Sequence, residues 1–560
     1  MSPKMLRHLS GRTKLEEQIF DVWEDLSPST AFRAGLDDRA GRFFVPSEEA
    51  VSTMIRRMRE LKASAENDVQ RKFLTSLERG LLFDEPQTIV DGAFTAFFDH
   101  IAKEGVNAKH LISLSDRADK ALDAFLKRVT KKKWSTGVKV LTILRCNGCL
   151  ELLETIRKQT KDLDLQKRMV ELQTTVKQYR RHFAVKGVKE ASFEEVFPIF
   201  RRTKEDLGRR KFYATFLKEA FDYAESPEEL EARGLRWLNT DLPKFKQLAK
   251  KLAKIYRVKP ESKYIKEALK KKSPVKPDQL VKFTKELRTR FLPWINKRLL
   301  RVNPGYDTRI IETPPYLAGI YPTAGVLPYN YLKGRPFQIY FITTDPKRDP
   351  PTGLGDLMQL LVHEEYGHCV NYSNSAVCYV AKPSLTEMLD SLLMAPVTEG
   401  FAFYLEKEFV QLFNDLVNGK DKSEEGRALL KFLRKHVDPK KLALENDFII
   451  RDWSITRYLR VIGDARINSG KQSLAEFVEW ASKRTGLSES RVYHQIFPAH
   501  EGIAPGYATC YAVVGERIRE LKNEAVRKGK DAVEFNTYAN GIGFPARTIF
   551  EEKLKKFISN

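Results

Sequence analysis

Residues 357–370 read LMQLLVHEEYGHCV, an apolar helical stretch that carries two histidines with carboxylates between them. His363 is followed directly by Glu364, and His368 comes five residues after His363. A hydrolytic zinc site needs three protein ligands with an open position for water, and a base beside that water. The stretch therefore predicts His363 and His368 as metal ligands and Glu364 as the general base.

The spacing of the two histidines sets a condition on the helix. Histidines at i and i+4 share one face of an α-helix, whereas positions i and i+5 lie about 140° apart. A bulge that widens one turn would bring them back to one face. Gly367, immediately before the second histidine, tolerates such a distortion. We therefore expect a bulged helix around Gly367; taken alone, the pair also fits two core histidines on a buried helix.

A third ligand is predicted downstream at Glu399, in the segment PVTEGFAFY (396–404). This carboxylate is embedded among apolar residues, where an unpaired charge is costly, so a cation is its expected partner. Glu387 and Asp390 are competing candidates for the third ligand. Either could instead orient a ligating histidine by a hydrogen bond, without binding the metal itself. The alternative for Glu399 is an acid in the first turn of a helix, favoured by the helix dipole.

A further cluster lies in the segment AHEGIAPGYATCY (499–511), a Gly-Pro turn that leads into a helix. His500, Tyr507 and Tyr511 could place an imidazole or a phenol against the oxyanion that forms during attack on a carbonyl. The alternative is ordinary packing of two tyrosines at i and i+4.

Most of the remaining sequence has the periodicity of amphipathic helices, for example at residues 51–61, 143–176 and 242–255. Between about residues 312 and 349 the composition changes to proline, tyrosine and β-branched residues, which predicts one or two strands directly before the metal helix. Residues 334–343 are interpreted as an edge strand to which an extended peptide adds. Prolines and glycines at residues 350–355 predict a turn before the metal helix.

The 560 residues are 42% hydrophobic, which is enough for a sizeable core and unlike a disordered chain. Lys and Arg number 97 against 74 Asp and Glu, a formal net charge of +23. Such an excess favours a polyanionic partner, but the basic residues are spread along the chain and no nucleic-acid motif accompanies them. A solvated, lysine-rich surface is therefore the preferred interpretation, and no nucleic-acid partner is expected.

The five cysteines are an odd, sparse set, which fits a reducing compartment rather than a disulfide framework. Cys146 and Cys149 form a C-x-x-C without a second pair, and we interpret them as structural. The sequence shows no apolar segment of signal-peptide or membrane-span length. These features predict a cytoplasmic protein without a membrane partner; they give no oligomeric state.

The motifs HEEYGH and EGFAFY resemble the signature of a large, poorly characterised family of bacterial and archaeal gluzincin-like zinc peptidases. That signature is His-Glu-x-x-Pro-Gly-His followed by a Glu-Gly-x-Ala-x-Tyr helix. The likeness covers about residue 193 to the C-terminus and includes residues 226–245, 460–490, 505–525 and 535–554.

The resemblance implies a mainly α, two-lobed metallopeptidase-like fold with a deep cleft and a small sheet before the zinc helix, similar to carboxypeptidase Taq and thimet oligopeptidase. It implies one zinc ion held by His363, His368 and Glu399. The spacing in HEEYGH is similar to that of dipeptidyl peptidase III. The chain departs from the signature in lacking the proline, in Cys369 where a further histidine is common, and in Asn468 where the family often has a histidine.

These expectations amount to a zinc-dependent metallopeptidase, of oligopeptidase or carboxypeptidase type, with a peptide substrate. The alternatives are a zinc amidase acting on a non-peptide substrate and a non-catalytic, basic protein that binds polyanions. The expected organisation is an N-terminal helical region (1–190), a helical region leading into the cleft (191–305) and a zinc-binding region (306–560).

Overall fold

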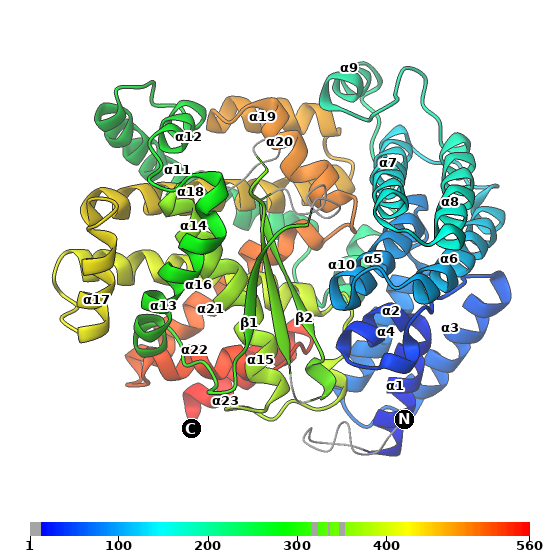
Figure 1. Cartoon of the computed structure of the whole chain (residues 1–560), viewed down its shortest axis with the longest axis horizontal. Coiled ribbons are helices and arrows are strands. Elements are labelled where there is room, and N and C mark those ends of the chain that lie inside the picture. The colour runs from blue at the N-terminus through cyan, green and yellow to red at the C-terminus, as the bar shows by residue number, and fades with distance from the viewer. Residues whose placement is uncertain (1–12, 315–322, 334–335, 346–352) are drawn as a thin grey trace.

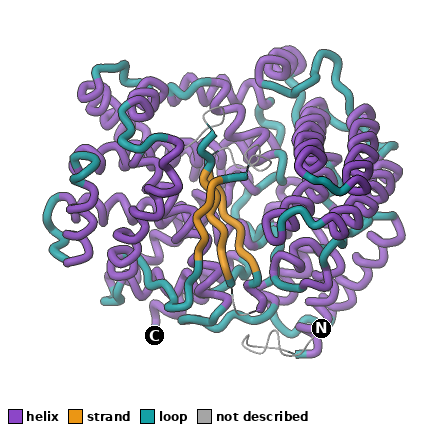
Figure 2. Tube along the Cα trace, viewed as in Figure 1, coloured by secondary structure: helices purple, strands orange, loops and turns teal. Residues whose placement is uncertain are grey.

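The computed structural model describes residues 13–314, 323–333, 336–345 and 353–560. It is mainly α-helical, with one small mixed sheet of three strands at its centre (Figure 2). Figure 1 shows the first eight helices gathered on one side of this sheet, and α11–α14 and α17 on the other side. The predicted fold class, mainly α with a small sheet directly before the motif helix, is confirmed.

The helices before the sheet are α1 (Lys14–Leu26), α2 (Pro28–Ala34), α3 (Glu48–Ala63), α4 (Asp68–Leu82), α5 (Pro86–Glu104), α6 (Ala108–Val129), α7 (Thr136–Gln159), α8 (Leu163–His182), α9 (Phe193–Thr203), α10 (Tyr213–Ala220), α11 (Pro227–Tyr256), α12 (Ser262–Lys271) and α13 (Leu280–Arg298). The helices after it are α14 (Leu354–Leu360), α15 (Val370–Ala376), α16 (Met394–Val417), α17 (Glu424–Leu433), α18 (Pro439–Asn468), α19 (Leu474–Thr485), α20 (Glu489–Ile496), α21 (Cys510–Arg527), α22 (Ala532–Gly541) and α23 (Arg547–Ser559).

Local sequence explains where these helices begin. The amphipathic stretch at residues 51–61 lies within α3, whose first N–H groups are capped by Ser47: its hydroxyl accepts a hydrogen bond from the N–H of Ala50 at 3.1 Å. Two glutamates in the first turn add favourable interactions with the helix dipole. The long α11 starts with a full capping box between Ser226 and Glu229. The single helical stretch expected at residues 143–176 is divided between α7 and α8.

The sheet is built from β1 (Thr308–Glu312), β2 (Ala324–Tyr329) and β3 (Phe337–Ile342), in the order β1-β3-β2. β1 runs parallel to β3 and β2 runs antiparallel to it. β3 is therefore the central strand, paired on both edges, and the interpretation of residues 334–343 as an edge strand is wrong. Gly334 and Arg335 lie outside the described residues, as do residues 315–322 and 346–349 of the predicted strand region and residues 350–352 of the predicted turn.

The packing of the sheet and of α16 places the motif. β2 and β3 both contact the segment Leu361–Cys369, and α16 packs against the same segment as well as against α21. The largest hydrophobic cluster includes members of all these elements, so the motif helix is held inside the main core. A second cluster joins the N-terminal helices α1–α4 to α15 and to residues 385–393. The three regional boundaries stay a prediction.

Candidate metal centre

The histidine motif lies in a π-helical segment, η4 (Leu361–Cys369), between α14 and α15. In a π-helix each turn is closed by an i→i+5 hydrogen bond, so residues five apart lie one above the other. His363 and His368 consequently share one face, with ring centres 4.9 Å apart and ring planes at 87°. The bulged helix predicted from the spacing is confirmed.

Small residues allow α16 to approach this segment closely. A Cβ atom added at Gly367 would lie 2.5 Å from the Cβ of Ala402 and 2.8 Å from its Cα, so a side chain has no room there. A Cβ at Gly400 would likewise lie 2.6 Å from the Cβ of Val514 on α21. Gly367 thus serves close packing as well as the distortion expected of it. In the Glu-Gly-x-Ala pattern, Gly400 contacts α21 and Ala402 contacts η4, so Glu399 lies where α16 packs against both elements.

Glu399, on the first turns of α16, meets both histidines. Its Oε2 atom lies 3.6 Å from Nε2 of His363 and 3.5 Å from Nε2 of His368. Two atoms that bind one zinc ion at about 2.0–2.1 Å in tetrahedral geometry lie about 3.3 Å apart. The donor atoms of His363, His368 and Glu399 all lie within 4.8 Å of one another, and this is a group that can hold a metal ion.

The carboxylate of Glu399 faces the two imidazoles at ion-pair distance. The buried Oε2 atom of Glu399 accepts no hydrogen bond from the described residues. Burial raises the pKa of Glu399, but the two nearby imidazoles of His363 and His368 outweigh burial and hold that pKa well below its ordinary value. Burial lowers the pKa of His363, but Glu399 and a second carboxylate, Glu406, raise it to about 9. A carboxylate oxygen without a hydrogen bond, facing two imidazole nitrogens, fits a bound divalent cation.

Glu406 orients His363 from behind. Its Oε1 atom accepts a hydrogen bond from Nδ1 of His363 at 2.7 Å, which leaves Nε2 directed at the metal position. Arg457 of α18 donates to both oxygens of Glu406 at 2.5 and 2.8 Å, and Gln359 donates at 2.9 Å. Burial raises the pKa of Glu406, but Arg457 and His363 together lower it to about 2. Sequence reasoning missed Glu406, although it follows Glu399 by seven residues, a spacing that returns to the same helix face.

Glu387 and Asp390, the alternatives to Glu399, lie elsewhere. Glu387 accepts a hydrogen bond from the N–H of Ser384 at 2.8 Å and pairs with Lys553. Asp390 pairs with Arg33 at 3.1 Å. Neither belongs to the metal-binding group, so Glu399 is the carboxylate that the fold brings to the histidines.

Glu364 and His363 line a pocket of about 260 Å³ beside the metal-binding group. Tyr511, Gln359, Arg457 and Arg460 also line it. Glu364 is half-buried, whereas its neighbour Glu365 is fully buried and pairs with Arg288 on the other side of the helix. Of the two consecutive glutamates, Glu364 is therefore the one that can reach a molecule in the pocket.

The three residues predicted from the Gly-Pro turn also converge here. His500 lies in a second π-helical segment, η6 (Phe497–Glu501), and Tyr507 opens the short 3-10 turn η7 (Tyr507–Thr509). The hydroxyl of Tyr507 donates to Oε1 of Glu399 at 2.9 Å, and the Tyr511 ring lies parallel to the His363 ring at 6.4 Å. The His500 ring is 5.7 Å from the Tyr507 ring and 5.6 Å from the Tyr511 ring.

The protonation of these three side chains is set by burial. Burial and the nearby charge of Arg460 lower the pKa of His500 well below its ordinary value, so its imidazole is neutral near pH 7. Nδ1 of His500 donates to the carbonyl oxygen of Gln495 at 2.9 Å, which leaves Nε2 as an acceptor. Burial and the charge of Glu399 raise the pKa values of Tyr507 and Tyr511, so both phenols keep their protons.

The predicted structural cysteines and Asn468 lie apart from this group, whereas Cys369 directly follows His368 in η4. Cys146 and Cys149 are free and buried in a hydrophobic cluster of the N-terminal helices. Asn468 donates to Asp464 and to Glu501 in a buried polar network. Among the described residues, His363, His368 and Glu399 form the one group suited to a metal ion.

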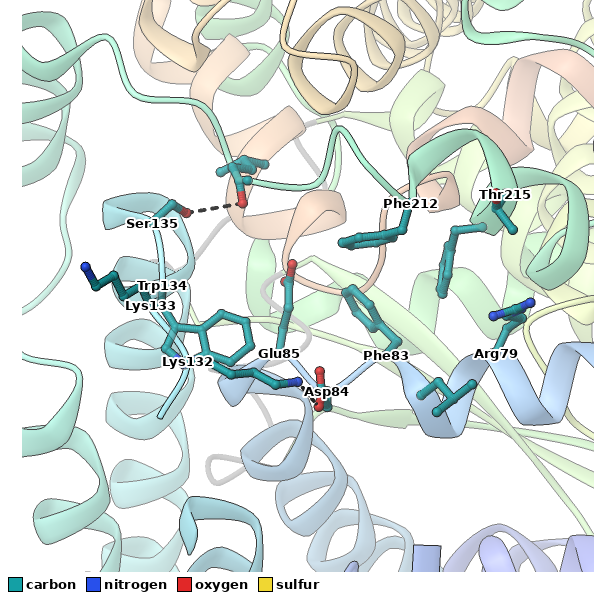
Figure 3. A pocket seen from close by; sticks show the side chains of 14 residues that line it. Arg79, Phe83, Asp84, Glu85, Lys132, Lys133, Trp134, Ser135, Phe212 and Thr215 are labelled. Carbon is teal, nitrogen blue, oxygen red and sulfur yellow. Dashed lines mark hydrogen bonds and ion pairs between the residues drawn. The ribbon is translucent and has the colours of Figure 1, made fainter. Parts of the chain in front are cut away.

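A second pocket, of about 380 Å³, lies among α4, α10 and the segment that connects α6 to α7 (Figure 3). Four aromatic rings line it, and its carboxylates Asp84 and Glu85 are paired with Lys132 and with the buried Arg209. It contains none of the residues that the sequence predicts to be functional.

No protein-family model and no curated protein sequence matches the chain. Two solved structures share its fold over nearly its whole length. One is described as "a putative lipoprotein of unknown function" from Shewanella oneidensis, with TM-score 0.63 and 15% identity over 97% of this chain and 100% of that one. The other is described as "the putative lipoprotein" from Colwellia psychrerythraea, with TM-score 0.61 and 14% identity over 98% of this chain and 99% of that one.

These matches contradict the predicted cytoplasmic location, because both similar structures are described as lipoproteins. In the described part of the chain every helix falls short of the length and apolar character needed to cross a bilayer. That observation does not support a cytoplasmic location, since a lipid anchor is attached covalently and requires no spanning helix. At this level of identity the similarity establishes the fold, so the likeness to gluzincin-like peptidases stays a prediction.

Proposed function

We propose that this protein is a zinc-dependent hydrolase that cleaves peptide bonds. The observation that carries the proposal is the convergence of His363, His368 and Glu399 on one point, with Glu364 facing the adjoining pocket. Two imidazoles and one carboxylate are a ligand set of catalytic zinc sites, which keep a fourth position open. The bond from His363 to Glu406 supplies the outer support that such ligands require.

Each residue has a defined task in this proposal. When bound, zinc would make water acidic enough to lose a proton near neutral pH and would polarise the substrate carbonyl. Glu364 accepts that proton and delivers it to the nitrogen of the leaving amine. Because His500 is neutral with its proton on Nδ1, its free nitrogen accepts rather than donates a hydrogen bond. The phenol of Tyr511, which lines the pocket, is therefore the better donor to the developing oxyanion, whereas the hydroxyl of Tyr507 already donates to Glu399.

A peptide substrate is supported by the position of β2. Ala324, the first residue of this edge strand, lines the pocket together with Glu364. An extended chain could add to an edge strand through main-chain hydrogen bonds. β2 replaces residues 334–343 in this role, because β3 is paired on both sides.

The test is substrate profiling of the zinc-loaded protein. A mixed peptide library is incubated with it, and products are identified by mass spectrometry beside a parallel panel of non-peptide amides. The proposal expects peptide cleavage that stops when a chelator removes the metal and returns with added zinc. Hydrolysis of the amides alone would assign a different amidase activity, and activity that survives the chelator would refute the zinc mechanism.

A further inference from the structure

Three cationic side chains line the pocket beside Glu364: Lys266, Arg457 and Arg460. Lys266 pairs with Asp452 at 2.6 Å, and Arg457 pairs with both oxygens of Glu406. Arg460 differs from the other two, because no carboxylate of the described residues lies within ion-pair distance of its guanidinium.

The hydrogen bonds of Arg460 go to neutral acceptors of the described residues. Its Nε atom donates to the carbonyl oxygen of Gln495 at 3.2 Å, and its Nη2 atom donates to the side-chain oxygen of Gln495 at 2.6 Å. The residue is 5% exposed. Burial lowers its pKa to about 10, so the group is still charged at neutral pH. A buried cation without a carboxylate at ion-pair distance is costly, and such a group is expected to receive an anion.

Arg460 lies beside the metal-binding group. The Cζ atom of its guanidinium is 4.9 Å from the ring centre of Tyr511, and that ring lies parallel to the His363 ring. Since Gln495 holds Nε and Nη2, one proton of Nη2 and both protons of Nη1 are left at the outer end of the fork. A planar carboxylate matches this end in a two-point hydrogen bond.

We propose that Arg460 binds the C-terminal carboxylate of a peptide, so that the site removes residues from the end of the chain. This inference rests on the proposed peptidase function for its catalytic step, but not for its binding step. The pocket, at about 260 Å³, is smaller than the roughly 300–1,000 Å³ of common small-molecule sites, which favours a chain end over a chain interior. In the reaction the last peptide bond breaks; water supplies hydroxyl to the carbonyl carbon and a proton to the leaving amine.

Binding is tested without metal, which separates it from catalysis. The chelator-treated protein is titrated by calorimetry with acetyl-Ala-Phe, with its C-terminal amide, and with acetyl-Ala-Asp-amide. The last probe offers the same carboxylate chemistry from a side chain. We expect the free acid to bind about tenfold to a hundredfold more tightly than either amide, as for a charged hydrogen-bonded pair.

Variants assign that preference to Arg460. Arg460→Met should abolish it, and Arg460→Lys, which keeps the charge but lacks the fork, should restore part of it. Arg202→Gln, which removes an exposed arginine of α9, is the matched control and should bind like the wild type. Thermal melting checks that the variants are folded. The inference would be overturned if acid and amide bound equally, if the acid did not bind at millimolar concentration, or if folded Arg460→Met kept the preference. If acetyl-Ala-Asp-amide bound more tightly than the free acid, the assignment to a C-terminal carboxylate would be overturned.

Turnover by the zinc-loaded protein gives the second readout. Arg460→Met should raise KM for peptides with a free C-terminus about tenfold to a hundredfold, with a smaller effect on kcat. Binding of the acid without any hydrolysis would refute the peptidase function and leave the Arg460 site standing. Cleavage of C-terminally amidated peptides as fast as free ones would refute the role of Arg460 and leave the peptidase function standing.

Discussion

The pocket beside His363 and the pocket beside Phe83 differ in a way that volume does not reveal. The second is the larger, at about 380 Å³ against about 260 Å³, and aromatic rings line it. Its carboxylates are each matched by a cation of the protein, as Figure 3 shows for Asp84 and Lys132. The smaller pocket instead adjoins a carboxylate oxygen without a hydrogen bond and a buried guanidinium without a carboxylate. We therefore expect the pocket with these unpaired groups, rather than the larger one, to be the functional site.

The largest expected effect concerns the base. Glu364→Gln should lower the rate of peptide hydrolysis about 10²–10⁴-fold while leaving the amount of bound zinc unchanged, because the amide cannot take a proton from water. Asp84→Asn, the equivalent change in the aromatic pocket, is the control and should retain the rate within about twofold. Full activity in Glu364→Gln, or an equal loss of activity in Asp84→Asn, would contradict the assignment of catalysis to the pocket beside His363.

Loss of the third ligand comes next. Glu399→Ala should weaken zinc binding at least about a hundredfold, since even the loss of an outer-shell partner costs about 10–100-fold. Competition with a chromophoric chelator measures the affinity. Glu387→Gln and Asp390→Asn, which change carboxylates placed away from the group, should bind zinc like the wild type. If one of these two variants bound zinc more weakly while Glu399→Ala kept the wild-type affinity, the substituted residue would be the third ligand in place of Glu399.

The support behind His363 should have a smaller effect on the metal. Glu406→Gln should weaken zinc binding about 10–100-fold. It should also lower the free energy of unfolding by about 3 kcal/mol, because it leaves Arg457 buried without its carboxylate. Chelator competition and chemical denaturation measure the two quantities. If Glu406→Gln lowered the free energy of unfolding but left the zinc affinity unchanged, Glu406 would have a structural role only.

The smallest effect concerns packing around the bulge. Gly367→Ala should lower the free energy of unfolding by about 1–3 kcal/mol, because the new methyl group would clash with Ala402. Ala402→Gly should restore part of the loss. The control is Gly148→Ala in α7, where nothing lies within 4 Å of an added Cβ. That change should stabilise the protein by about 0.5–1 kcal/mol. Equal effects at the two glycines would show that close packing at Gly367 is unimportant.

The parts of the site that sequence reasoning predicted are those that depend on local spacing. Histidines five apart can share an ion only on a widened turn, so the chemistry itself predicted the π-helical segment. Glu399, an acid in an apolar helix, was identified by the cost of burying it. Amphipathic periodicity located α3 and the second half of α11 for a related reason, since one face of each helix must be buried.

The parts that were missed depend on contacts between distant segments. Arg457 and Arg460 reach the pocket from α18, and no local pattern connects them to the histidines. The interpretation of residues 334–343 as an edge strand failed for the same reason. β3 is central because β1 also pairs with it, in parallel, and this pairing is set by the tertiary fold. Glu406 combines both cases. Its seven-residue spacing from Glu399 can be read from the sequence, but its hydrogen bond to His363 can be seen only in the structure.

Zinc analysis with X-ray absorption spectroscopy tests the metal-centre hypothesis most directly. The protein is purified without added metal, loaded with zinc and freed of excess ion, and compared with His363→Ala and His368→Ala. The hypothesis predicts one zinc ion per chain in the wild type, bound by two imidazoles and a carboxylate oxygen, and loss of that ion in both variants. Zinc bound without histidine ligands, or a stoichiometry that neither substitution changes, would contradict it.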